Sequence, residues 1–293
     1  MRKSAMIRVI AWSVTIVTLL GILLVGMRGG WGSRDWEWGN FAWNNNTVHE
    51  DTYDNADRYQ IGNAEVKADG ITEIQLYWIA GSVRVELHDG DEILIEETSS
   101  RSLSEDHQLR WLLQDGILTV RHLRAGRTRN VPSKALTLKI PRDMEQLTLF
   151  ALDSISAGVW VEGVTARTVR LESVSGALNA TDLICDSLRY DSISGRVTLA
   201  GAFGAVDGET VSGSSTLHST IMPGSLSAES ISGSFRVEVP EGDFAALLDS
   251  MSGNMSSNID GARVSKDAVF VGSGGPTFEF ETVSGSVRVD RID

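Results

Sequence analysis

The sequence predicts an all-β protein, a single-chain β-solenoid of stacked repeats of about 18–20 residues, preceded by one transmembrane helix. Three observations predict this architecture. A five-residue pattern of acid, hydroxyl, apolar residue, Ser and Gly recurs six times. Stretches in which apolar and polar residues alternate flank the copies of this pattern. One uncharged apolar run lies close to the N-terminus.

The repeated pattern has a nearly constant period. Its copies begin at Glu172, Asp191, Glu209, Glu229, Asp249 and Glu281. A seventh copy, Asp153–Gly158, carries one extra residue before its Gly. The steps from Gly to Gly are 18 to 20 residues, apart from one of 32 before the last copy. A fixed period this short predicts units that are too small to bury a core alone and must stack.

Each repeat predicts two short strands joined at a corner. After the Gly, apolar residues fall at the second and fourth positions, as in Val197 and Leu199, and the residues between them are mostly polar. Before the acid, Leu188 and Tyr190 show the same alternation. The phase breaks at Ser-Gly, where Gly permits positive φ and Ser bonds to its own backbone. The motif's apolar residues, from Val174 to Val283, are expected to stack as one buried column.

Composition and motifs argue against several classes of function. The formal net charge of −13 disfavours nucleic acid as the main partner. The single cysteine, Cys185, excludes an intramolecular disulfide and fits a small core residue. The chain contains no P-loop, dinucleotide fingerprint, HExxH, CxxC or GxSxG motif, and its five His are scattered. We therefore predict a protein that is not an enzyme and has no cofactor.

The N-terminus predicts a single-pass membrane anchor. Residues 1–8 are basic and residues 9–27 carry no charge. Nineteen helical residues span about 28 Å, close to the ~30 Å hydrocarbon core of a bilayer. The basic residues place 1–8 in the cytoplasm and the remaining chain outside the cell membrane. A cleavable signal peptide is the alternative, but it requires a shorter apolar run and a small-x-small cleavage site.

Three further segments follow the anchor. Residues 28–63 form a juxtamembrane segment and polar linker, in which Trp31, Trp36, Trp38 and Trp43 predict an aromatic belt at the membrane interface. In the alternative interpretation, this segment packs on the outer domain. Residues 64–146 are predicted to be an N-terminal β region of the solenoid domain, and residues 147–293 its regular Ser-Gly repeats.

One basic segment interrupts the acidic domain. Arg121, Arg124, Arg127 and Arg129 lie within nine residues. Two interpretations apply to them. They form a solvated hairpin loop, or they contact an anionic partner such as lipid headgroups or wall polymer.

The motif acids raise a question of charge. If the repeats stack as neighbouring strands, successive carboxylates lie about 4.8 Å apart. Such a row requires solvation, pairing with Arg170, Arg189 or Arg196, or a bridging cation. A solvated acidic ridge is the first interpretation. Weak Ca²⁺ binding at Glu209, Glu229 and Asp249 is the second. Glu281 follows the long interval and is expected to be displaced from the row.

The chain resembles the bacterial putative adhesin family with β-strand repeats, a family of unknown function. The resemblance is carried by Ile79–Val85 (IAGSVRV), by Leu136–Pro141 (LTLKIP) and by the later Ser-Gly repeats, and it covers residues 64–293. It implies a membrane-anchored protein with its repeats outside the cell.

The sequence therefore predicts a membrane-anchored extracytoplasmic β-solenoid of the cell envelope. We expect a non-enzymatic scaffold or adhesin-like protein that binds an envelope polymer or another membrane protein. One alternative is an accessory component of an envelope-stress signalling system. A carbohydrate-active β-helix enzyme is a second alternative, but such enzymes place one irregular charged cluster on the coil, whereas these acids recur once per repeat.

Overall fold

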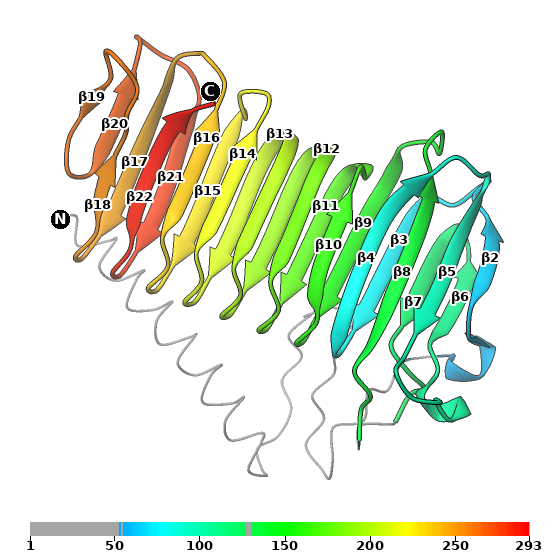
Figure 1. The fold of residues 1–293 in the computed structure, drawn as a ribbon. Coiled ribbons are helices and arrows are strands. Elements are labelled where there is room, and N and C mark those ends of the chain that lie inside the picture. Colours follow the sequence, from blue (N-terminus) through cyan, green and yellow to red (C-terminus); the bar gives the residue numbers. More distant parts are fainter. Residues whose placement is uncertain (1–52, 54, 127–129, 293) are drawn as a thin grey trace.

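In the computed structural model, residues 53, 55–126 and 130–292 are described (Figure 1). Within them the structure is all-β, with two short 3-10 helices at Ala56–Arg58 and Glu105–His107. No helix in this part of the chain is long and apolar enough to cross a membrane. The predicted anchor at 9–27 and the Trp-rich segment lie outside the described residues.

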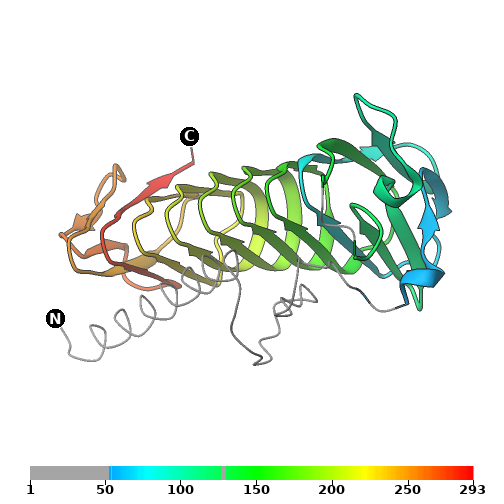
Figure 2. The same ribbon diagram turned by 90° about the horizontal axis from the view of Figure 1, so that it is seen from below.

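The regular part is a stack of two-stranded rungs (Figures 1 and 2). Its strands are β9 (Leu147–Ser154), β10 (Gly158–Glu162), β11 (Thr165–Ser173), β12 (Leu178–Ser192), β13 (Val197–Thr210), β14 (Ser215–Ser219), β15 (Ser225–Ser230), β16 (Phe235–Val239), β17 (Phe244–Ser250), β18 (Asn254–Ser256), β21 (Thr277–Thr282) and β22 (Ser286–Arg291). All rung-to-rung pairings among them are parallel. The structure is thus solenoid-like, as the repeat period predicts.

The N-terminal part closes one end of the stack with antiparallel strands. It contains β1 (Gln60–Ile61), β2 (Ala64–Lys67), β3 (Glu73–Trp78), β4 (Gly81–His88), β5 (Glu92–Thr98), β6 (Arg110–Gln114), β7 (Ile117–Arg121) and β8 (Lys134–Pro141). Strands β3 and β4 form a rung that pairs in parallel with β9 and β10 on one side and with β7 and β8 on the other. Strands β5, β2, β6 and β1 add antiparallel pairings and cover this end.

At the C-terminal end, the order of the rungs differs from their order in the chain. Strand β15 pairs with β21 rather than with β17, and β16 pairs with β22. Strand β17 lies on the far side of β21, and β20 (Ala268–Val271) and β19 (Arg263–Val264) extend the sheet beyond it in antiparallel fashion. The chain therefore builds its outermost rung first and then returns to fill the position beside β15 and β16.

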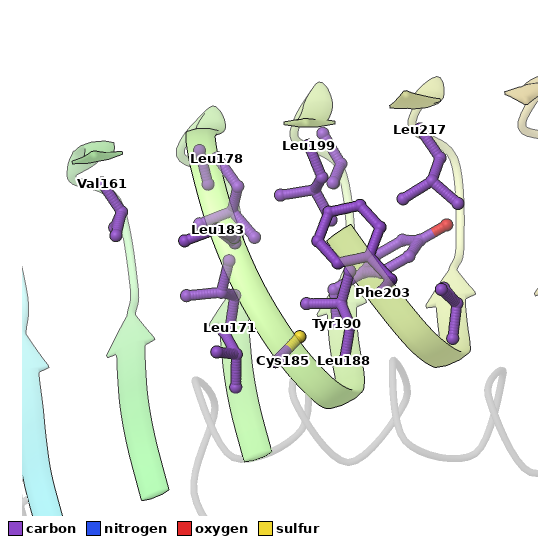
Figure 3. Packing of buried hydrophobic residues seen from close by; sticks show 14 of the residues in the cluster. Val161, Leu171, Leu178, Leu183, Cys185, Leu188, Tyr190, Leu199, Phe203 and Leu217 are labelled. Atoms are coloured by element: carbon purple, nitrogen blue, oxygen red, sulfur yellow. The ribbon is translucent and has the colours of Figure 1, made fainter. Parts of the chain in front are cut away.

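A single hydrophobic core runs along the stack. Its largest fully buried side chains include Trp78, Phe150 and Phe203 in the first rungs and Phe278 and Phe280 near the last. Leucines from opposite sides of the rungs face one another across the core, as Figure 3 shows for the region around Leu188. Cys185 is buried among them, as the sequence predicts, and burial raises the pKa of its thiol to about 12.

The corner glycines are required for a different reason from the predicted one. Gly213 and its equivalents in the other regular repeats do not have positive φ. A Cβ placed on Gly213 would instead lie 2.1 Å from the backbone oxygen of Gly195 in the neighbouring rung. The rungs stack so closely at the corner that no side chain fits between them.

Candidate interaction face along the corner

Three rows of side chains run along one corner of the solenoid, and we call them together the corner face. The acidic row consists, in rung order, of Asp153, Glu172, Asp191, Glu209, Glu229, Glu281 and Asp249. Strict register between neighbouring strands places each acid beside the next. With strands about 4.8 Å apart, the row is about 29 Å long. The predicted alignment of the acids across rungs is therefore confirmed.

The prediction that Glu281 is displaced from the row is wrong. Glu281 lies between Glu229 and Asp249, so Asp249 occupies the end of the row. The cause is the out-of-order rung, because β21 inserts between β15 and β17. Among the proposed Ca²⁺ ligands, Glu209 and Glu229 are neighbours but Asp249 is not beside either. Within the described part of the chain, no group of three or more His, Cys, Asp or Glu is placed to hold a metal ion.

The two hydroxyl residues of the motif build the corner. The first, such as Ser192, is buried, and its Oγ accepts a hydrogen bond from the N–H of Gly195, the Gly three residues later, at 3.1 Å. The second, such as Ser194, is exposed and donates to the backbone oxygen of Val174 in the neighbouring rung at 3.2 Å. Because the first hydroxyl turns inward to cap the turn, the residues on either side of it turn outward.

The apolar ridge consists of the side chains between these two hydroxyls, together with Ile79, which occupies the equivalent place between Trp78 and Ala80. Its members, in rung order, are Ile79, Ile155, Val174, Ile193, Val211, Ile231, Val283 and Met251. The prediction of a buried column is wrong, because all of them are partly exposed and Met251 is 51% exposed. The column does stack in order from rung to rung, but it faces outward since the inward position belongs to the capping hydroxyl. The second serines form an exposed row beside it.

Burial and repulsion between neighbouring carboxylates raise the pKa values of five members of the acidic row. Burial, followed by the charge of Glu172, raises the pKa of Asp153 to about 7. Burial, followed by the charge of Asp191, raises the pKa of Glu209 to about 7. The pKa values of Glu172, Asp191 and Glu229 are raised for the same primary reason. Asp153 and Glu209 are therefore partly protonated near neutral pH.

Arginines offset the charge of only part of the row. Arg170 lies 3.9 Å from Asp153 and 3.3 Å from Glu172. Arg189 lies 3.3 Å from both Asp191 and Glu209. Arg196, which was also expected to pair, follows the corner Gly and is exposed. None of the ion pairs among the described residues involves Glu229, Glu281 or Asp249.

Aromatic and basic residues continue the acidic row at its N-terminal end. Tyr77 is the register partner of Asp153, Arg121 of Tyr77, and Arg110 of Arg121. The Arg121 guanidinium lies over the rings of Tyr53 and Tyr77, 4.4 and 4.1 Å from their centroids. The sequence did not indicate this cluster, because its members come from four segments that no motif connects.

The basic segment is therefore not one exposed cluster. Arg121 is only 4% exposed because the aromatic rings cover it, so it is not available to a surface partner. Arg124 is exposed and lies 3.0 Å from Asp106 in an ion pair. Arg127 and Arg129 lie outside the described residues.

The sheet that carries the acidic row also holds a shallow hollow of about 370 Å³. Small and acidic residues of four neighbouring strands line it, among them Ser187, Ala205, Asp207 and Glu279. Its open shape and small side chains offer no enclosed site for a small molecule. An arrangement of this kind is suited to contact with an extended partner.

A family comparison bears on the repeats just described. Residues 142–290 match the Toastrack DUF4097 family model. The chain belongs to this family. The match spans 149 of the 293 residues and covers the regular rungs together with strands β19 and β20. Membership confirms the resemblance to adhesin-type repeat proteins that the sequence indicates.

Solved structures with a similar fold include proteins that carry adhesin names. One is a "putative adhesin" from Bacteroides fragilis, with 13% identity, coverage of 80% of this chain and 97% of that chain, and a TM-score of 0.44. A "putative cell adhesion protein" from Clostridium sporogenes has 8% identity, coverage of 80% and 100%, and a TM-score of 0.37. A "putative lipid binding protein" from Parabacteroides distasonis has 11% identity, coverage of 79% and 96%, and a TM-score of 0.41. No curated protein sequence matches significantly.

Proposed function

We propose that this Toastrack DUF4097 protein is a membrane-anchored, extracytoplasmic scaffold of the bacterial cell envelope that binds a partner along the corner face. One observation supports the binding of a partner along the corner face most strongly. The apolar ridge stays partly exposed at eight successive rungs, from Ile79 to Met251. A continuous exposed apolar surface of this kind is typical of an interaction site rather than of a surface evolved only for solubility.

The chemistry of the corner supports a binding role rather than catalysis. The buried serine hydroxyls of the motif, such as that of Ser173, are occupied in hydrogen bonds with the backbone of the turn. The carboxylates recur once per rung instead of gathering at one irregular position. Repetition of one weak contact over many rungs gives affinity for an extended partner by multivalency.

Site-specific photocross-linking in intact cells tests the proposed binding face. A photoreactive residue at exposed Ser194 or Ser212 lies in the serine row, whereas one at exposed Thr181 lies away from the corner. We expect a discrete envelope adduct from Ser194 and Ser212 and none from Thr181. Equal adducts from all three positions, or none from the serine row, would contradict a binding role for the corner face.

The anchor and its topology have their own test. Residues 9–27 should remain in the mature protein, and protease added to intact, wall-stripped cells should degrade the solenoid. A mature chain that begins beyond Met27, or a solenoid that is protected until the cells are lysed, would contradict a membrane-anchored extracytoplasmic scaffold.

A further inference from the structure

We propose that the corner face accepts a cationic amphipathic α-helix of a partner protein, laid along the solenoid axis with its apolar stripe on the ridge and its Lys or Arg stripe on the acidic row. This inference rests on the proposed function, since it names the chemistry of the partner that the corner face binds. It is argued from spacing, from charge and from the position of the arginines.

The spacing of the rungs favours a helix over a strand. Rungs repeat about every 4.8 Å, and an α-helix repeats its side-chain faces about every 5.4 Å. The two periods drift apart by about 0.6 Å per turn, so the mismatch reaches half a rung only after about four turns. An extended strand places side chains on one face about 6.7 Å apart and is out of step by almost half a rung after one repeat.

The order of the rows matches the surface of such a helix. The apolar ridge lies between the carboxylates and the exposed serines, because the three positions follow one another around the corner. On a helix, residues at i, i+3, i+4 and i+7 form an apolar stripe, and the positions beside it form a flanking polar stripe. Long Lys and Arg side chains pack their stems along apolar surface while the charged groups reach carboxylates.

The arginines indicate where the helix binds. Arg170 and Arg189 already contact acids in the first half of the row. In the second half of the acidic row, among the described residues, Glu229, Glu281 and Asp249 have no such ion pairs. The apolar ridge ends beside them at Met251, which is its most exposed member. A cationic partner lowers the repulsion between these neighbouring carboxylates.

At the opposite end of the row, one carboxylate oxygen has no hydrogen-bond donor within the described part of the chain, although an arginine lies nearby. Asp153 is 6% exposed, and its Oδ1 is buried without a hydrogen-bond partner among the described residues. A buried carboxylate oxygen of this kind is costly unless a donor reaches it. Asp153 therefore keeps an acceptor that the arginine beside it does not satisfy.

Binding of designed peptides to the full chain in zwitterionic nanodiscs tests this inference. The probe is a fluorescent 18-residue peptide of Lys and Leu that forms a helix with adjacent cationic and apolar stripes. Its controls are the same peptide with Glu for Lys, the same composition in scrambled order, the same peptide with a central Pro, and an alternating Lys-Val peptide that favours a strand. Empty nanodiscs measure peptide binding to lipid.

Variants of the chain locate the binding. We expect the triple variant E229Q/E281Q/D249N to weaken peptide binding by about tenfold, in a salt-dependent way. The matched variant E162Q/D182N/D186N removes three exposed carboxylates away from the corner and should leave binding unchanged. The double variant I231T/V283T should weaken binding without changing its salt dependence, because it alters only the ridge.

Several results would overturn the inference. These are equal binding of the scrambled or Glu peptide, stronger binding of the alternating Lys-Val peptide, or no effect of the triple variant. If replacing Trp31, Trp36, Trp38 and Trp43 by Ser uncovers binding that the intact chain lacks, the occupant is this chain's own N-terminal segment and the inference is wrong. Cross-linking to an envelope partner at Ser194 would still support the proposed function in each case.

Discussion

The two ends of the solenoid are stable for different reasons. From β9 onward, the rungs repeat one corner, in which a Gly allows the neighbouring rung to approach and, wherever the hydroxyl residue is Ser, that Ser caps the turn. At the N-terminal end, the antiparallel pairings of β1, β2, β5 and β6 and a set of buried polar groups replace that repetition. In the repeats, stability is distributed over many equivalent contacts, whereas at the N-terminal end it is concentrated in a few contacts that occur once.

Lys134 is the centre of these single contacts. It is 3% exposed, and its Nζ donates to the Glu97 carboxylate and to the backbone oxygens of His107 and His122. The Nζ also lies 5.1 Å from the centroid of the Trp78 ring. Burial and the Lys134 charge lower the pKa of His122 to about 3, so this His is neutral in the folded protein. We infer that changing one repeated contact costs less stability than changing a buried charge that occurs once.

The largest effect is expected from Lys134→Met. The substitution leaves Glu97 as an uncompensated buried carboxylate and should lower the free energy of unfolding by about 3–5 kcal/mol. The control is Lys139→Met on the same strand. The ion pair of Lys139 with Glu96 is partly exposed, so this substitution should change the free energy of unfolding by less than about 1 kcal/mol. Urea unfolding monitored by circular dichroism measures both. Equal effects of the two variants would show that the N-terminal end does not depend on this buried pair.

A smaller effect is expected from Gly213→Ala in the repeats. The new Cβ would meet the Gly195 oxygen at 2.1 Å, so the rungs must separate locally, at a cost of about 3 kcal/mol or less. Gly274→Ala is the matched control, since no atom lies within 4 Å of its added Cβ. Differential scanning calorimetry should show a lower Tm for Gly213→Ala only. An unchanged Tm for the Gly213→Ala variant would mean that the corner glycines do not set the rung spacing.

The smallest effect is expected from pH. Because the pKa values of Asp153 and Glu209 are raised to about 7, the folded protein binds more protons than the unfolded chain between about pH 4 and 7. The stability contribution of these acids therefore falls as pH rises through this window. Neutral His122 acts in the opposite sense below about pH 6.5, because only the unfolded chain is then protonated at this His.

Glu209→Gln separates these contributions. The Tm of the variant minus the Tm of the wild type should be about 1–3 °C higher at pH 8 than at pH 5.5. Glu162→Gln, an exposed substitution away from the acidic row, should leave the pH profile of the wild type unchanged. An identical profile for Glu209→Gln and wild type would contradict the mutual repulsion within the row.

The repetition made much of the fold predictable from the sequence. The period predicts the stack, and the shared place of Glu172 and Asp191 in the motif predicts that they align. The outward orientation of the ridge was missed, because alternation alone does not show that the hydroxyl at Ser192 takes the inward position. The reason for the corner glycines was also missed, since contacts between rungs are not visible in one repeat.

The N-terminal cluster could not be predicted for another reason. Tyr53, Tyr77 and Arg121 are distant in the sequence and meet only once the sheet has formed. The insertion of the last rung beside β15 was equally hidden. The 32-residue step before Gly285 marks an irregularity, but both Asp249 and Glu281 begin a complete motif and either rung fits beside Glu229.

Disulfide formation tests the rung order, on which the continuous corner face depends. Ser232, Ser284 and Ser252 are exposed members of the serine row, and the structure places Ser284 between the other two. A disulfide needs Cα atoms about 4.4–6.8 Å apart, which neighbouring rungs provide and rungs about 9.6 Å apart do not. Under mild oxidation, S232C/S284C should form an intramolecular disulfide and S232C/S252C should not. Efficient closure of S232C/S252C, with S232C/S284C remaining reduced, would contradict the arrangement of the acidic row and the apolar ridge.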